Sequence, residues 1–424
     1  VGLAFALYGM NQASERARNA QAIADVLGDM IVGSNPYEMK GDQPVTVEMM
    51  LDQMHATAKE RLQDQPEVLL QILKHLSQAY FTHSRMRSAV DVGKEAHSVA
   101  MQLYGENHLE TAYIADHLGG MLTTSFPDSA REESHYYLNS SYRAYADLLG
   151  DEHHATLVTL IYLGKWNRQY SEAEEAEKIY NKVLTICRKH AGDTAYDNTR
   201  AFLLHTLIRS HRDSKDYPET MRLAEELHAL RRRMHGPNHP NTLNAKYDVG
   251  RAYWWNGQLD RATAVLIEVL KTQSDRLGPD HLDVAETHQA LAGVEIASLH
   301  FKDAIAHAES AYHIFKSNNP KGEDTILGLI SLIGVVTTAG QSVGAEGLQM
   351  ELLQHFRDEL ANLRTSPDSI EQTFRNLIQI SFTYFDACGS GDPVSQTMLQ
   401  LLVPALREHG RQTELEEFEP LLTK

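Results

Sequence analysis

The sequence predicts an all-α, right-handed superhelical solenoid of about seven helical hairpins with helical caps, and two recurring patterns carry this prediction. The first is a loop pattern, Gly-x-(Asn/Asp/Glu)-His, which occurs as "GENH", "GDEH", "GPNH" and "GPDH". Counted with a weaker copy, "GDTA", its glycines stand at positions 105, 150, 192, 236 and 278. Spacings of 42 to 45 residues are typical of stacked supersecondary units, each of which buries its apolar face against the next.

The second pattern lies between the loops and has the spacing of a helical hairpin. An aliphatic anchor residue is followed four positions later by a bulky residue and thirteen positions later by a small one, as in Val249, Tyr253 and Ala262. Residues four apart share one face of a helix. A large residue that faces a small one lets two helices approach closely, so each repeat is expected to be a pair of packed helices.

The loop residues have readable roles at helix ends. A glycine just after a helix can adopt the left-handed conformation that terminates it. The polar residue and the histidine that follow can cap the next helix, and Pro240 would then stand at a first helical position. We therefore expect the recurrent histidines to serve capping or packing between hairpins, and no metal or catalytic role.

These residues resemble the tetratricopeptide repeat, most clearly in "VGRAYWWNGQLDRA" at residues 249–262. The linkers "HGPNHPNTL" and "LGPDHLDVA" resemble those of the kinesin-light-chain variety. The resemblance covers residues 65–316 well and residues 324–360 weakly. It implies an array of helical hairpins that binds other proteins.

We expect three segments along the chain. Residues 1–63 form an N-terminal helical segment, residues 64–365 the repeat array and residues 366–424 a C-terminal helical cap, with helices from Pro367 to about Phe385, from Pro393 onward and over "TELEEFEPLL". The apolar start "VGLAFALYGM" is either the buried beginning of a helix or the trailing end of a transmembrane helix.

The segment order ahead of the repeats resembles that of many bacterial membrane-anchored serine/threonine protein kinases. There, a similar segment follows the transmembrane helix and leads into a kinesin-light-chain-like array. The resemblance implies a non-catalytic regulatory or sensor region on the extracytoplasmic side of the membrane. One alternative is a free-standing cytoplasmic adaptor that resembles the cargo-binding part of a kinesin light chain. Another is an enzyme with a buried site around Cys388.

Motifs for chemistry are weak in this chain. "HRDSKD" at residues 211–216 reads like a kinase catalytic loop, but Pro218 stands where that loop needs an asparagine for magnesium. The repeat instead places these letters in a hairpin turn, with Lys215 at the turn position. His235 and His239 are separated by Gly236 and Pro237, so they cannot share a helix face as metal ligands do. We expect neither catalysis nor a cofactor, and the net charge of −18 argues against nucleic-acid binding through a general basic surface.

The repeat geometry also predicts a binding surface on the first helix of each hairpin. In the third to fifth hairpins its inward positions collect cationic and aromatic side chains: Lys165, Arg168, Phe202, His205, Arg209, Arg212, Asn244, Tyr247, Arg251, Trp254 and Trp255. Arginine binds carboxylates well, and aromatic residues anchor interfaces. We therefore expect an acidic peptide or protein partner with an aromatic or aliphatic anchor. The alternative is that Trp254 and Trp255 pack between hairpins while the arginines pair with nearby carboxylates.

Overall fold

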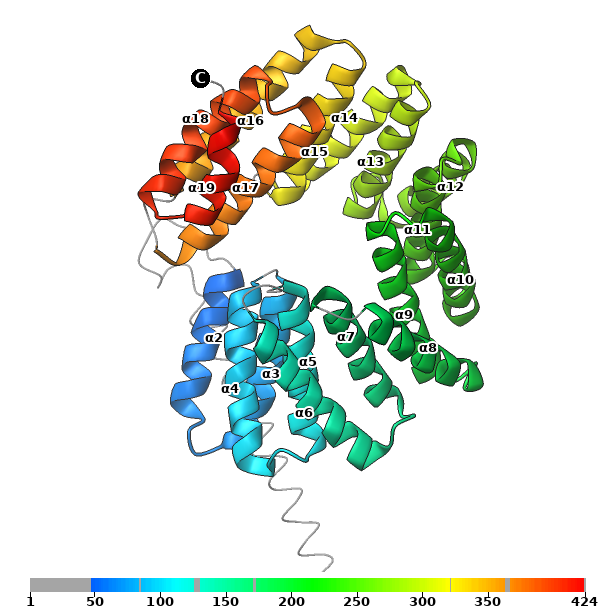
Figure 1. The fold of residues 1–424 in the computed structure, drawn as a ribbon, viewed down its shortest axis with the longest axis vertical. Helices are drawn as coiled ribbons and strands as arrows, with labels where there is room; N and C mark the ends of the chain where they lie inside the picture. Colours follow the sequence, from blue (N-terminus) through cyan, green and yellow to red (C-terminus); the bar gives the residue numbers. More distant parts are fainter. Residues whose placement is uncertain are drawn as a thin grey trace, which may run out of the picture. The chain divides into compact units, whose positions relative to one another are not determined.

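The computed structural model describes residues 47–83, 85–125, 130–170, 173–320, 322–362 and 367–422. Over these ranges the regular structure is entirely helical (Figure 1). The helices are α2 (Val47–Arg61), α3 (Pro66–Thr82), α4 (Met86–Tyr104), α5 (Leu109–Ser125), α6 (Arg131–Leu149), α7 (His154–Tyr170), α8 (Ala173–Lys189), α9 (Thr194–Asp213), α10 (Tyr217–His235), α11 (Pro240–Trp255), α12 (Leu259–Leu277), α13 (Leu282–Ala297), α14 (Phe301–Asn318), α15 (Glu323–Thr338), α16 (Ser342–Asn362), α17 (Pro367–Cys388), α18 (Pro393–Glu408) and α19 (Gln412–Phe418), followed by a short 3₁₀ helix (Glu419–Leu421).

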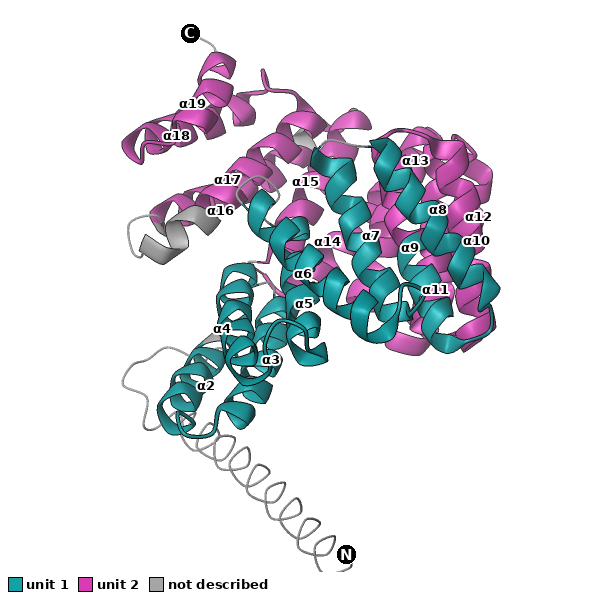
Figure 2. Ribbon diagram, turned by 60° about the horizontal axis from the view of Figure 1, so that its bottom comes forward, with its two compact units in different colours: residues 1–203 teal, residues 204–424 magenta. Residues whose placement is uncertain are grey.

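Helices α3 to α16 follow one another as seven hairpins, which are numbered 1 to 7 here, and the two helices pack together in hairpins 1 to 3 and 5 to 7. The predicted all-α helical-repeat fold is thereby confirmed. The chain divides into two compact units, residues 1–203 and residues 204–424 (Figure 2). The predicted limits at residues 63 and 365 stay predictions, and the apolar start of the chain lies outside the described residues.

The loops between hairpins owe their shape to glycine and histidine, as the sequence predicts. Gly236 ends α10 with φ of 85°, a left-handed conformation that glycine adopts without a steric penalty. Two positions after Pro237, the His239 imidazole Nδ1 accepts the backbone N–H of Asn241 at 3.2 Å and so caps α11. The same imidazole cap recurs in the equivalent loops, from His108 to Glu110, from His153 to Ala155 and from His281 to Asp283, at 3.1–3.3 Å.

The turns inside hairpins 4 to 7 each contain one residue with a left-handed backbone. Gly257 and Gly340 supply it in hairpins 5 and 7, with φ of 74° in both. In hairpin 4 the position belongs to Lys215, with φ of 60°, which confirms that "HRDSKD" is a hairpin turn. Hairpin 6 places Leu299 there, with φ of 62°.

Close packing inside each hairpin follows the predicted pairing of large and small residues. Val249, Tyr253 and Ala262 are all buried. A methyl group added to Gly250 would lie 2.7 Å from Leu266 on the partner helix, so the absence of a side chain sets the spacing of α11 and α12.

The C-terminal helices close hairpin 7. Phe374 of α17 and Leu402 of α18 belong to the same buried cluster as Leu332 of α15, as expected of a cap on an exposed apolar face. Asp392 caps α18 by accepting the Val394 N–H at 2.9 Å. Within the described ranges, no helix combines the length and the apolar character that a membrane span requires.

Candidate functional site

Four of the predicted binding residues form one cluster in the unit of residues 204–424. We call Arg212, Tyr247, Asp248, Arg251 and Trp255 the Trp255 cluster. The Arg251 guanidinium carbon lies 4.7 Å from the centre of the Trp255 ring and 5.4 Å from that of Tyr247, and the Arg212 guanidinium lies 5.7 Å from the Trp255 ring. Tyr247, Arg251 and Trp255 are four residues apart and so share one face of α11, while Arg212 comes from the last turn of α9.

The cluster combines two guanidinium groups with nearby carboxylates. Partial burial raises the pKa of Asp248 to about 6, against the opposing pull of Arg251 and Arg212 and with a further rise from Glu286. Burial likewise raises the pKa of Tyr247 to about 12, so its hydroxyl stays protonated. Two permanent guanidinium charges therefore lie among the carboxylates of Asp213, Asp248 and Glu286, and Asp248 takes up a proton in mildly acidic solution.

Arg209 extends the cationic surface of α9 by one turn from Arg212. Its side chain is exposed, and no carboxylate of the described residues forms an ion pair with it. His205, a further turn back, and Asn244 on α11 are also exposed. Arg212 itself donates to its neighbour Asp213 at 2.7 Å, an exposed pair that is worth little in water.

Three of the predicted cationic and aromatic residues, Lys165, Arg168 and Phe202, belong to the unit of residues 1–203 and make contacts there. Lys165 donates to the Thr124 hydroxyl at 3.2 Å, and Arg168 pairs with Glu177 at 3.0 Å. Phe202 packs against the ring of Tyr162, with centroids 5.2 Å apart. The alternative in which the arginines pair with nearby carboxylates therefore applies to Arg168 and, through Asp213, to Arg212.

The structure separates the two adjacent tryptophans. The Trp254 ring contacts Gly293 of α13 so closely that a side chain at position 293 would collide with it. Trp254 thus packs between hairpins 5 and 6, whereas Trp255 lies with the arginines. A partner-binding role for either residue stays a prediction.

Hairpins 1 and 2 hold a cavity of about 200 Å³ that the sequence analysis did not single out. Its mouth carries Gln71, Lys74, His75 and Gln78 of α3, together with Tyr113 and His117 of α5. Leu76 is the aliphatic anchor of this hairpin. Gln71, Lys74 and Gln78 stand five and two positions before it and two after it, as Asn244, Tyr247 and Arg251 stand relative to the anchor Val249. The same rule, applied without a preference for basic residues, would have found this mouth.

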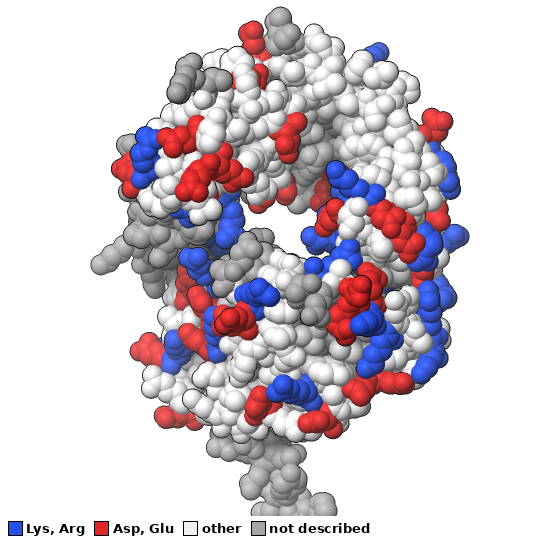
Figure 3. All heavy atoms as spheres, viewed as in Figure 1, with Lys and Arg blue, Asp and Glu red and all other residues white. Residues whose placement is uncertain are grey.

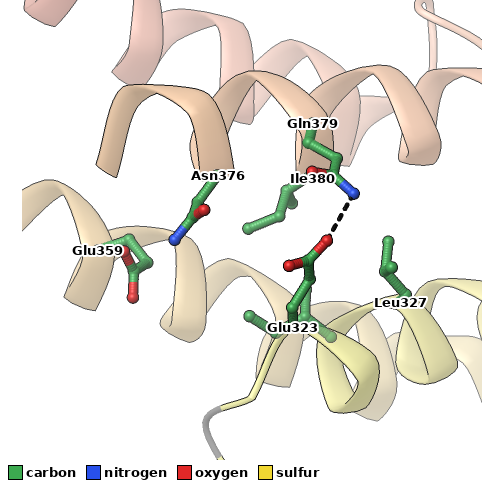
Figure 4. A pocket seen from close by; sticks show the side chains of 7 residues that line it. Glu323, Leu327, Glu359, Asn376, Gln379 and Ile380 are labelled. Atoms are coloured by element: carbon green, nitrogen blue, oxygen red, sulfur yellow. Dashed lines mark hydrogen bonds between the residues drawn. The ribbon is translucent and has the colours of Figure 1, made fainter. Parts of the chain in front are cut away.

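A smaller pocket of about 40 Å³ lies between α15, α16 and α17, lined by Glu323, Ile326, Leu327, Glu359, Asn376, Gln379 and Ile380 (Figure 4). The Gln379 carboxamide donates to the Glu323 carboxylate at 2.8 Å. Since one water needs about 10–15 Å³ of such space, the pocket has room for a few waters only.

The thiols and histidines are arranged for packing. Burial raises the pKa of Cys187 to about 11 and also raises that of Cys388, so both thiols are held in their weakly nucleophilic protonated form. Among the residues whose placement is described, no three His, Cys, Asp or Glu side chains converge as metal ligands would.

Comparisons with known proteins agree with this architecture. Residues 204–241 and 244–317 match models of the tetratricopeptide repeat. No curated protein is matched by the sequence. The fold is similar to that of the apo form of the quorum sensor NprR from B. thuringiensis, over 73% of this chain and 81% of that one, with 12% identity and a TM-score of 0.51.

Two further solved structures are similar to about half of this chain. BtubC (BKLC) from P. vanneervenii is similar over 57% of this chain and 96% of its own, with 16% identity and a TM-score of 0.48. Kinesin-light-chain TPR-like repeats of Podosopora anserina are similar over 52% and 93%, with 18% identity and a TM-score of 0.33. The association with a kinase stays a prediction. The two matched stretches show tetratricopeptide repeats within residues 204–317, inside a series of consecutive helical hairpins.

Proposed function

We propose that this chain is a non-catalytic protein-interaction module, and that the Trp255 cluster captures an acidic segment of a partner protein. The observation that carries the proposal is the position of the Trp255 ring beside the guanidinium groups of Arg212 and Arg251, at 5.7 and 4.7 Å. Such a site offers a carboxylate two charged forks and offers a neighbouring apolar side chain an aromatic surface.

The basic character needed for this capture is local. Figure 3 shows Lys and Arg interspersed with Asp and Glu on the viewed face, and the chain as a whole has a net charge of −18. An acidic partner would be repelled by much of the surface and attracted where Arg209, Arg212 and Arg251 gather on α9 and α11. This contrast favours selective binding of one acidic segment over general adhesion.

A binding experiment with a matched charge control tests the proposal. The probe is a fluorescein-labelled ten-residue peptide of Glu and Asp with one central Trp, followed by polarisation. The double variant Arg209→Glu/Arg251→Glu is expected to weaken binding at least about tenfold. Lys271→Glu/Arg276→Glu makes the same charge change at exposed positions of α12, away from the cluster.

Two results would count against this site. Unchanged affinity in the Arg209/Arg251 variant would remove the cluster from consideration. An equal loss in the Lys271/Arg276 variant would show that only net charge matters. Far-ultraviolet circular dichroism of all three proteins shows whether the helices are retained.

We also propose that the array is the regulatory region of a bacterial serine/threonine kinase. Support comes from the segment order ahead of the repeats, which resembles that of membrane-anchored kinases. The test is the coding sequence immediately upstream of Val1. A transmembrane stretch preceded by a kinase domain is expected, with the array on the extracytoplasmic side. A start codon or an unrelated domain there would favour the alternative, a free-standing cytoplasmic adaptor that resembles the cargo-binding part of a kinesin light chain.

A further inference from the structure

The cavity of hairpins 1 and 2 has an apolar floor. Ala96 of α4 and Leu118 and Met121 of α5 line it, and all three side chains are buried. Gly93 also lines it, and Leu118 occupies the place where a side chain at position 93 would stand, since a methyl group there would lie 2.8 Å from it. A charged ligand group would lose its hydration against this floor without any compensating partner.

The mouth of the cavity is polar but nearly neutral. The Lys74 ammonium is already bound by the Glu110 carboxylate at 2.5 Å and lies 5.0 Å from the centre of the Tyr113 ring. Burial and the charge of Lys74 lower the pKa of His117, so its imidazole is uncharged at neutral pH. Lys74 and Glu110 balance each other and His117 adds no charge, so these three groups give no net attraction for an acidic or a basic side chain.

Two carboxamides at the mouth have hydrogen-bonding capacity to spare. Gln71 and Gln78 stand seven residues apart on one face of α3, about 10 Å along the helix axis. Neither side chain makes a hydrogen bond with another residue of the described ranges. A carboxamide offers both donors and an acceptor, which matches the paired N–H and C=O groups of an extended peptide.

We infer that this cavity takes one aliphatic side chain of leucine or methionine size from an extended peptide whose backbone is held by Gln71 and Gln78. The apolar floor selects the uncharged side chain, and the volume of about 200 Å³ accommodates several carbon atoms. This inference rests on the proposed function in calling for a peptide partner, but it concerns the other compact unit and a different ligand chemistry.

Met121 provides a direct readout, because its side chain lies in the floor and is 7% exposed. The full chain is labelled with ¹³C at its methionine methyl groups, and Met121→Leu identifies the signal in a methyl spectrum. N-acetyl-leucine methylamide is expected to shift this signal in a saturable way with a Kd of about 1 mM. The matched lysine and glutamate derivatives are expected to leave it in place. A shift by all three probes, or by none, would overturn the inference.

Variants of the mouth separate backbone recognition from simple apolar filling. The double variant Gln71→Ala/Gln78→Ala is expected to weaken binding of the leucine probe about tenfold. The Met121 signal of the unliganded protein is expected to keep its position. Gln102→Ala, an exposed position of α4 outside the cavity, is the control and is expected to bind normally. Equal binding by all three proteins would contradict the role of the carboxamides.

Two more variants distinguish this inference from the proposed acidic site and from filling of the cavity by the chain itself. The Arg209→Glu/Arg251→Glu variant is expected to bind the leucine probe normally, so the acidic site and this cavity can fail independently. Deletion of residues 1–40 is expected to leave the unliganded Met121 signal unchanged. A shift after deletion would mean that the chain's own leading segment fills the cavity, which would overturn capture of a partner there.

Discussion

Lys215 and Gly257 occupy the same position in successive hairpin turns, and both have a left-handed backbone, with φ of 60° and 74°. For a residue with a side chain this conformation costs about 1–2 kcal/mol, part of which glycine would return as extra entropy of the unfolded chain. Lys215→Gly is therefore expected to raise the free energy of unfolding by about 0.5–1 kcal/mol.

Urea denaturation followed by circular dichroism measures this effect. Leu299→Gly, at the equivalent turn of hairpin 6, should act in the same direction, since Leu299 has φ of 62°. Gly257→Ala is the reverse control and should destabilise. A loss of stability in Lys215→Gly would mean that the lysine side chain compensates for its strained backbone.

The histidine caps make the loops between hairpins sensitive to side-chain identity. His239→Ala removes the acceptor for the Asn241 N–H, and the expected loss of stability is about 1 kcal/mol. His239→Asp keeps an acceptor and should recover most of that loss. Equal stability of the alanine and aspartate variants, measured by urea denaturation at pH 7.5, would argue against the cap.

Asp116 gives the fold a dependence on pH. Burial raises its pKa from 3.8 to about 7, against a hydrogen bond of 2.6 Å from the Thr159 hydroxyl. The folded state therefore binds the proton more tightly than the unfolded state does. Its contribution to stability is present below about pH 4 and is lost as the pH rises through 7.

Asp116→Asn should remove this dependence, because the amide keeps the acceptor for Thr159 and carries no charge. The variant is expected to be more stable than the parent at pH 8, and the difference should shrink towards pH 4. Thermal unfolding of both proteins at several pH values measures the difference. A constant gap across the range would show that the carboxyl group is not the titrating group.

The two adjacent tryptophans should respond differently to substitution. Trp254→Ala empties the contact with Gly293 between hairpins 5 and 6, so it should cost about 2 kcal/mol of stability. Trp255→Ala should lower the stability by less than half of this amount and should instead weaken binding of the acidic peptide. Urea denaturation and fluorescence polarisation, applied to both variants, test this division. A larger loss of stability in Trp255→Ala, with weaker peptide binding in Trp254→Ala, would contradict this assignment.

The sequence predicts the repeat boundaries well because the deciding interactions are local. Gly236 and His239 act on helix ends within five residues of themselves, and Lys215 is recognised by its place in the period. Only the backbone conformation and one side-chain acceptor are needed in each case, and both follow from residue type.

Side-chain directions depend on residues far away in the sequence and are harder to predict. The Trp254 side chain contacts Gly293, 39 positions later in the sequence, while the Trp255 ring lies beside Arg212, 43 positions earlier. The repeat period places both tryptophans near the inner face but does not decide between these partners.

The unanticipated cavity has a similar cause. Its floor needs Gly93 of α4 and Leu118 of α5 to meet, a contact between successive hairpins. A search for clustered basic residues passes over it, since its mouth has one lysine among amides and aromatic rings.

The loop between two successive hairpins is held in shape by hydrogen bonds within a short stretch of chain. In the first of these loops the Thr111 hydroxyl donates to the Gly105 carbonyl at 2.8 Å, and His108 caps the helix that begins next to it. The residues that make these hydrogen bonds lie within a few positions of one another in the sequence. A gene segment that encodes one complete hairpin therefore also encodes the loop residues that connect it to the next hairpin. The array can then be lengthened or shortened by duplication or loss of whole segments.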